Sequence, residues 1–109
     1  MTFLALGYLR TDVSQQHREW DEARIRSLAR RLGYDLTDTI ACDAHDPIQV
    51  QLLMDTVHEL DVEAVIVPTA DHFDDHTVPA ELIKVTDVIT VAPEQTFARW
   101  STGALPRHD

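Results

Sequence analysis

Residues 64–67 read Ala-Val-Ile-Val, a mainly β-branched run that is apolar on both faces of an extended chain. A sheet strand with one solvated face alternates apolar and polar residues, whereas a strand covered on both faces is apolar throughout. Pro68 follows directly and ends the run, because proline has no backbone N–H to offer to a sheet. The run therefore predicts a central parallel strand that is covered by helices.

Helical periodicity on the N-terminal side of this run supplies candidates for the covering layers. Residues 15–32 form the first expected helix, with Ser14 as its cap and Gly33 as its left-handed stop. Residues 46–47, Asp-Pro, predict the start of a second helix, because proline at the first helical position loses no hydrogen bond. In both segments apolar residues recur at i, i+3, i+4 and i+7: Ile25, Leu28, Ala29 and Leu32, then Val50, Leu53, Met54 and Val57.

The remaining segments are predicted to complete the same sheet. Further strands are expected at residues 3–9, 34–41 and 88–91, with a short helix at 81–84 and a terminal helix that opens at Pro93 and carries Phe97 and Trp100. The alternation predicts an α/β three-layer sandwich with a mostly parallel sheet of four to five strands. Residues 1–100 are expected to form this single domain, and residues 101–109 a flexible C-terminal tail.

The charge of the chain is acidic and unevenly distributed. Nine Lys and Arg stand against 19 Asp and Glu, for a net charge of −10, and residues 32–83 contain no Lys or Arg. Nucleic-acid binding depends on basic contacts to phosphate, so DNA binding is not expected. The single cysteine, Cys42, excludes an internal disulfide, and no apolar run is long enough to span a membrane. A cytoplasmic location without membrane contact is expected.

In a parallel sheet, functional residues collect in the loops after the carboxyl ends of the strands, here residues 10–14, 42–46 and 68–77. The first loop belongs to the segment YLRTDVSQQ at residues 8–16. This segment resembles the opening motif of the serine recombinases, the resolvase and invertase family: a strand, Tyr, any residue, Arg, any residue, Ser and a later Gln. Residues 65–75, VIVPTADHFDD, are similar to the family's apolar strand followed by Leu-Asp-Arg-Leu-x-Arg. The resemblance implies a resolvase-like fold over residues 3–91.

The departures from the family pattern fall on its chemistry. The resemblance implies a nucleophilic serine two residues after Arg10, but that position holds Asp12, whose carboxylate would repel a phosphate. It also implies arginines around the phosphate, and His72 and Asp75 stand where the family has two of them. No catalytic residue is therefore expected. The sequence predicts a vestigial site composed of Arg10, Asp12, Ser14, Gln16, Asp71, His72 and Asp75.

A metal site is the competing interpretation of the third loop. His72 and His76 are four residues apart, so on a helical turn both imidazoles would share one face and could hold one ion. Asp75, Cys42 or His45 would be the third ligand. A zinc ion held there would lower the pKa of a bound water, as in small metal-dependent hydrolases. The segment lacks the general-base Glu of a His-Glu-x-x-His helix, and the leading expectation is a chain without a cofactor.

The leading functional hypothesis is a resolvase-like domain that has lost recombinase activity and acts as a non-catalytic interaction or regulatory module. A protein partner or a homo-oligomer is expected, on the helix face that carries Arg24 and Arg31 or at Phe97 and Trp100. Two further possibilities stay open. One is a residual DNA-recombination or nucleic-acid role through the basic helix, and the other is an anion site at the Ser14–Gln16 helix start beside Arg10.

Overall fold

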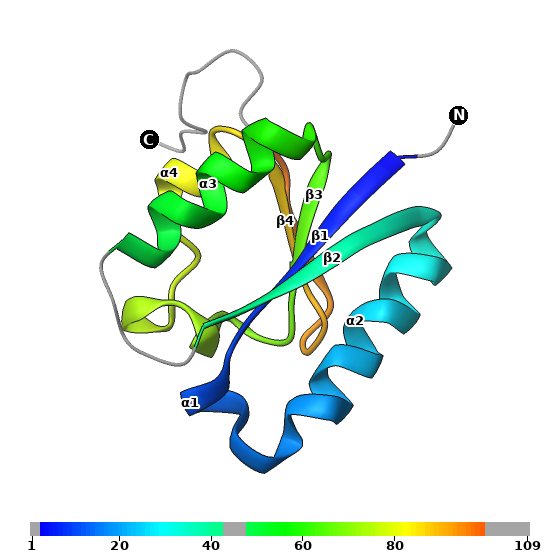
Figure 1. Cartoon of the computed structure of the whole chain (residues 1–109), viewed down its shortest axis with the longest axis vertical. Coiled ribbons are helices and arrows are strands. Elements are labelled where there is room, and N and C mark those ends of the chain that lie inside the picture. Colours follow the sequence, from blue (N-terminus) through cyan, green and yellow to red (C-terminus); the bar gives the residue numbers. More distant parts are fainter. Residues whose placement is uncertain (1–2, 43–47, 100–109) are drawn as a thin grey trace.

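A five-stranded sheet organises the computed structural model, which describes residues 3–42 and 48–99 (Figure 1). The strand order is β2-β1-β3-β4-β5; the first four strands are parallel, and β5 is antiparallel to β4. The prediction of a mostly parallel sheet of four to five strands is confirmed. The strands are β1 (Phe3–Arg10), β2 (Tyr34–Cys42), β3 (Ala64–Val67), β4 (Asp87–Thr90) and β5 (Gln95–Phe97).

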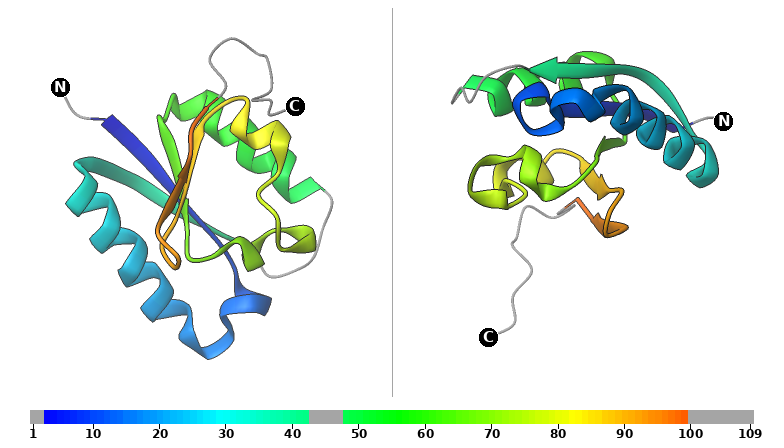
Figure 2. Two further views of the ribbon diagram at one scale, coloured as in Figure 1. Left: turned by 180° about the vertical axis from the view of Figure 1, so that it is seen from behind. Right: turned by 90° about the horizontal axis from the view of Figure 1, so that it is seen from below.

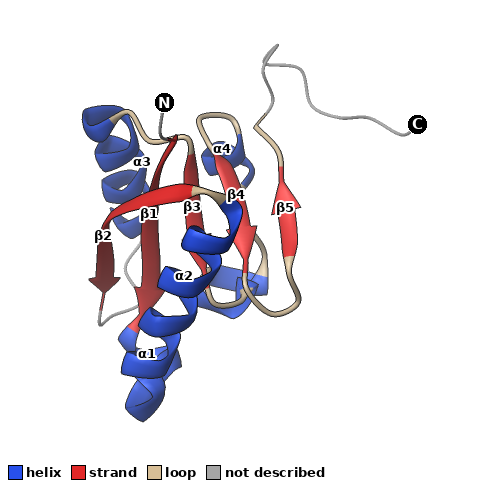
Figure 3. Cartoon of the chain, turned by 90° about the vertical axis from the view of Figure 1, so that its right-hand side faces the viewer, coloured by secondary structure: helices blue, strands red, loops and turns tan. Residues whose placement is uncertain are grey.

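Helices cover both faces of the sheet. In Figures 1 and 2, α2 lies on one side of the sheet and α3 and α4 lie on the other, and Figure 3 shows the same division from the side. The predicted three-layer sandwich is therefore confirmed. The α-helices are α1 (Thr11–Ser14), α2 (Arg18–Leu32), α3 (Ile48–Leu60) and α4 (Ala80–Ile83), and the 3-10 segments are η1 (Gln15–His17), η2 (Ala70–His72) and η3 (Asp74–His76).

The two faces of the sheet hold separate apolar clusters, because successive strand side chains point to opposite sides. In β3, Ala64 and Ile66 join the cluster under α2, while Val65 and Val67 join the cluster under α3 and α4. All four β3 residues are buried, as the apolar run predicts for a covered central strand. Full burial of a Val or Ile side chain contributes about 1.5–3 kcal/mol, so this short strand stabilises both layers.

The first helix departs from its prediction. A continuous helix over residues 15–32 is wrong: α1 ends at Ser14, η1 follows, and α2 begins only at Arg18. Gln15 has φ 52°, which breaks the helix. Ser14 makes no side-chain capping hydrogen bond, because its hydroxyl is used elsewhere. The predicted stop is confirmed, since Gly33 has φ 86° and its N–H bonds the carbonyl of Arg30 at 3.2 Å.

The predicted terminal helix at Pro93 is also wrong. Residues 91–94 form a turn, and β5 returns beside β4 with Phe97 opposite Val88. A three-residue strand depends on its partner for hydrogen bonds, so its own sequence carries little signal. The short helix and fourth strand are found within one residue of the predicted 81–84 and 88–91.

Several predictions concern segments outside the described residues. They are the helix start at 46–47, the part of the second loop at 43–46, Trp100 and the tail at 101–109. The boundary of the domain at residue 100 stays a prediction. Within residues 3–42 and 48–99, no helix is both long and apolar enough to cross a membrane.

Candidate functional site

The crevice at the carboxyl ends of β1 and β3 is where this topology places a site. From β1 the chain moves outward to β2 on one side, and it then crosses to β3 on the other side of β1. In open α/β sheets, ligands bind where the strand order reverses in this way. Arg10 ends β1, and η2 and η3 follow β3, so the first and third predicted loops meet at this crevice.

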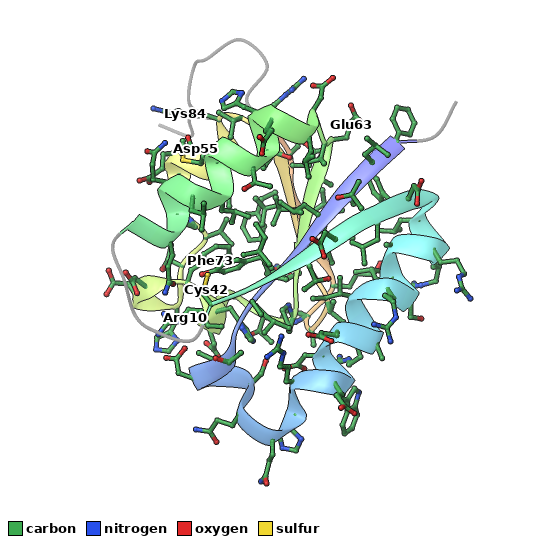
Figure 4. All side chains as sticks on the ribbon, viewed as in Figure 1. Arg10, Cys42, Asp55, Glu63, Phe73 and Lys84 are labelled. Atoms are coloured by element: carbon green, nitrogen blue, oxygen red, sulfur yellow. The ribbon has the colours of Figure 1, made fainter. Side chains whose placement is uncertain are left out.

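Arg10 is the central residue of the site and is only 8% exposed. Its guanidinium donates two hydrogen bonds to Asp12, from Nε to Oδ1 at 3.1 Å and from NH2 to Oδ2 at 2.6 Å. A third bond runs from NH1 to Asp74 Oδ1 at 3.3 Å. The hydrogen bond to Asp12 raises the pKa of Arg10. The one cation of the site is therefore engaged by two carboxylates (Figure 4 labels Arg10).

His72 holds the backbone beneath that ion pair. It is 2% exposed, and its Nδ1 accepts the backbone N–H of Arg10 at 2.9 Å. An accepting Nδ1 carries no proton, so the ring is the neutral tautomer with hydrogen on Nε2. Burial lowers the pKa of His72, and this outweighs the nearby carboxylates of Asp21 and Asp71, which raise it. His72 thus acts as a structural acceptor at neutral pH.

Contacts made by Tyr8 and Thr11 fix the ends of the neighbouring strands around the crevice. Tyr8 stacks on Phe73 with ring centroids 5.3 Å apart, and its hydroxyl donates to Gln49 Oε1 at 3.3 Å. Burial raises the pKa of Tyr8, which keeps its hydroxyl protonated as a donor. Thr11 Oγ1 donates to the Cys42 carbonyl at 3.2 Å and so ties the end of β1 to the end of β2. Figure 4 labels Arg10, Cys42 and Phe73 close to one another.

Ser14 has a hydrogen-bond partner on α2. It is 3% exposed, and its hydroxyl donates to Asp21 Oδ2 at 2.5 Å. The predicted anion site at a Ser14–Gln16 helix start is wrong in its premise, because α1 ends at Ser14 and α2 begins at Arg18. Gln16 lies exposed in η1.

The predicted metal ligands lie in two separate segments. His72 is in η2 with its Nδ1 on the Arg10 backbone, whereas His76 is in η3 with its Nδ1 2.8 Å from Asp71 Oδ1. Asp75 has φ 58°, so residues 72–76 do not form the helical turn on which both imidazoles would share a face. Across the described part of the chain, no group of three or more His, Cys, Asp or Glu is placed to hold a metal ion. His45 lies outside that part.

Two carboxylates that bind predicted site residues were not predicted from the sequence. Asp74 lies 64 residues from Arg10 and Asp21 lies 7 residues from Ser14, and neither spacing is a recognised motif. The expected interaction residues on α2 differ in their settings: Arg31 pairs with Glu94 at 2.7 Å, while Arg24 lines a hollow of about 250 Å³ with Trp20. Phe97 is half-buried in β5 against the cluster under α3 and α4.

Comparison with solved structures gives the fold a counterpart. The crystal structure of the C-terminal catalytic domain of ISC1926 TnpA, an IS607-like serine recombinase, superposes with a TM-score of 0.63. The match covers 82% of this chain and 67% of that chain, at 16% sequence identity. The chain has the fold of a serine-recombinase catalytic domain.

The resemblance predicted from residues 8–16 and 65–75 is thus confirmed at the level of this serine-recombinase fold. A scan against protein-family models finds no match, and a search of curated proteins also finds none. At 16% identity the likeness concerns the fold, while the residues of the crevice determine what chemistry is open to this chain.

Proposed function

We propose that the chain is a non-catalytic interaction or regulatory module built on the serine-recombinase catalytic fold. The observation that carries the proposal is the two-bond ion pair between Arg10 and Asp12. In the resemblance, Arg10 matches the arginine of the opening motif, and Asp12 matches the nucleophilic serine. Asp12 therefore takes the place of the attacking hydroxyl, and its carboxylate also binds the Arg10 guanidinium.

The other matching positions add no positive charge to the crevice. His72 is buried with Nδ1 accepting a backbone N–H, and Asp74 binds Arg10 from the opposite side. Asp75 matches a further arginine of the family pattern and carries a carboxylate. Preorganised cations or hydrogen-bond donors are needed to stabilise a phosphoryl transition state. Among the described residues of the crevice, the only arginine is Arg10, and it is paired with two carboxylates.

Ser14 is a poor replacement for the lost nucleophile. Its hydroxyl is buried and already donates to Asp21. A phosphodiester approaching Ser14 would also meet the Asp21 carboxylate, and two negative groups within contact distance repel each other. This arrangement supports a structural role for Ser14 between α1 and α2.

A covalent-capture assay tests the proposal. The purified full chain is incubated with negatively supercoiled plasmid, and protein–DNA adducts and nicked or linear DNA are sought after denaturation. The wild-type chain is expected to give neither product, because in its described residues Arg10 is engaged by two carboxylates and the Ser14 hydroxyl is buried on Asp21. An active serine recombinase on its own target serves as the positive control.

Two variants make the negative result informative. Asp12→Ser restores a hydroxyl at the matching position, but it is still expected to form no adduct because His72 and Asp75 remain. Ser14→Ala is the control for a shifted nucleophile. A wild-type adduct that disappears in Ser14→Ala would contradict the proposal and assign the attack to Ser14.

A further inference from the structure

The outer edge of β2 is unpaired within the part of the chain that the structure describes. β2 is the terminal strand of the sheet order, and its hydrogen-bonded neighbour is β1. Its register with β1 slips between Leu36 and Asp38, so Thr37 is an extra residue in the strand. Such a bulge interrupts a regular edge, which leaves residues 34–36 as a short regular stretch before it.

A hollow of about 440 Å³ lies against this stretch. It is lined by Arg26, Ala29 and Arg30 of α2 and by the consecutive residues 33–36. Side chains of successive strand residues point to opposite faces, so a hollow that meets Tyr34, Asp35 and Leu36 in turn runs along the backbone edge of the strand. The free N–H and C=O groups of that edge thus open into the hollow.

The flank of α2 above the hollow is positively charged. Arg26 and Arg30 are four residues apart and both exposed, so their side chains neighbour each other on the helix surface. Elsewhere on α2, Arg18 pairs with Glu22 and Arg31 pairs with Glu94. Neither Arg26 nor Arg30 has an ion pair with another residue of the described ranges. Two guanidiniums with no ion pair inside residues 3–42 and 48–99 therefore lie beside the edge of β2.

Charge excludes a second copy of this chain as the natural occupant. Two antiparallel β2 edges would be related by a twofold axis perpendicular to the sheet, which keeps α2 and its copy on the same face. Arg26 and Arg30 would then face their own copies, and like charges facing each other are unfavourable. The opposite face of the edge carries the exposed Asp35 and Asp38. The edge therefore favours a peptide segment whose side chains are acidic on the face of α2 and neutral on the face of Asp35 and Asp38.

We propose that this edge, formed by residues 34–36 of β2 together with Arg26 and Arg30, binds a short extended acidic peptide segment of a partner protein by strand addition. Backbone hydrogen bonds to β2 would supply affinity, and the two arginines would select acidic side chains at alternate positions. The proposal names the partner chemistry for the interaction module proposed above. The β2 edge lies at the amino end of the parallel strands, whereas Arg10 lies at their carboxyl end. A failure of the peptide assay can therefore be told apart from a failure of the plasmid assay.

Fluorescence anisotropy with labelled peptides tests the edge. The probe is a blocked seven-residue peptide of alternating Glu and Thr, compared with a Lys and Thr peptide of the same length. The Glu peptide is expected to bind the wild-type chain and the Lys peptide is not. Arg26→Ala/Arg30→Ala is expected to weaken Glu-peptide binding at least about tenfold, because two charge-assisted contacts are lost. Arg24→Ala/Arg31→Ala, the matched control on the other flank of α2, is expected to change it less than about twofold.

Four results would overturn the proposal. Equal weakening by both double variants would mean that the attraction is unspecific. Undiminished binding of a Glu peptide with N-methylated backbone amides would exclude strand addition, since methylation removes the donors. Wild-type sedimentation as a dimer that Arg26→Ala/Arg30→Ala dissociates, or displacement of the Glu peptide by a single-stranded oligonucleotide, would assign the edge to another occupant.

Discussion

At the scale of single residues, the Arg10 side chain shows how far the partners of one residue depend on the folded chain. An arginine at the end of the first strand is ambiguous in the sequence, because it can face a ligand or an ion pair. The structure places Asp12 on one side of its guanidinium and Asp74 on the other. The Asp12 contact is bidentate, which is the strongest geometry for an arginine–carboxylate pair. Asp12 is two residues from Arg10 in the sequence, whereas Asp74 is 64 residues away and gives no local signal.

His72 gives a prediction on pH. Burial lowers its pKa in the folded chain below the ordinary 6.5. Between those two pKa values the unfolded chain binds the proton and the folded chain does not, so stability falls as pH drops below about 6.5. The slope from this group is at most about 1.4 kcal/mol per pH unit. Urea unfolding at a series of pH values between neutral and acidic measures it.

His72→Asn isolates this effect, because an Asn oxygen can accept the Arg10 N–H but does not titrate. The free energy of unfolding of His72→Asn is expected to depend less steeply on pH than that of the wild type. His58→Asn, at an exposed histidine of α3, is the control. An unchanged slope in His72→Asn would show that His72 does not titrate as described.

At the scale of elements, the close packing of α2 on the sheet depends on Gly7. A Cβ at this position would lie 2.6 Å from Thr39 Oγ1 and 3.1 Å from Ile25 Cγ2. Gly7→Ala is therefore expected to destabilise the chain by about 1–3 kcal/mol, the usual cost of overpacking. Adding Thr39→Ala should recover part of that loss because it removes the nearest atom. Chemical denaturation of the single and double variants measures both effects.

Gly33→Ala provides the contrast to that packing effect. A Cβ on Gly33 meets no atom within 4 Å, and its φ of 86° imposes only left-handed strain. The expected cost is about 1–2 kcal/mol, and Thr39→Ala should not reduce it. If Gly7→Ala were as stable as the wild type, or if Thr39→Ala rescued both glycine variants equally, the packing account of Gly7 would be wrong.

The elements that the sequence predicts well are those with a local signal. Residues 64–67 are apolar on both faces. In the predicted stripe of α2, Ile25, Leu28 and Ala29 are buried as the period indicates, whereas Leu32 at the end of the helix is exposed. The predictions that were wrong concern elements and contacts that depend on partners elsewhere in the chain. β5 exists because β4 supplies its ladder, and Ser14 bonds Asp21 rather than capping a helix. The first and third loops meet at the strand ends, as the predicted topology requires, but the ion pairs of Arg10 could be seen only in the folded chain.

At the scale of the whole molecule, the distribution of charge along the chain and the topology of the sheet together determine the charge beside the end of β1. The stretch from residue 32 to residue 83 has no Lys or Arg, and it supplies η2 and η3 beside the end of β1. This topology thus brings the carboxylates of Asp12 and Asp74 together at the carboxyl ends of β1 and β3. The basic residues gather instead on α2, whose Arg26 and Arg30 line the hollow at the other end of the sheet.

We expect that Arg10, held by the carboxylates of Asp12 and Asp74, does not meet phosphate. The Nε–H resonance of Arg10, assigned by its loss in Arg10→Lys, reports this directly during titration of the ¹⁵N-labelled chain with phosphate and with a short DNA duplex. The resonance is expected to stay fixed in the wild type and to shift in Asp12→Ala/Asp74→Ala, where the guanidinium is released. A saturable shift in the wild type would contradict the claim.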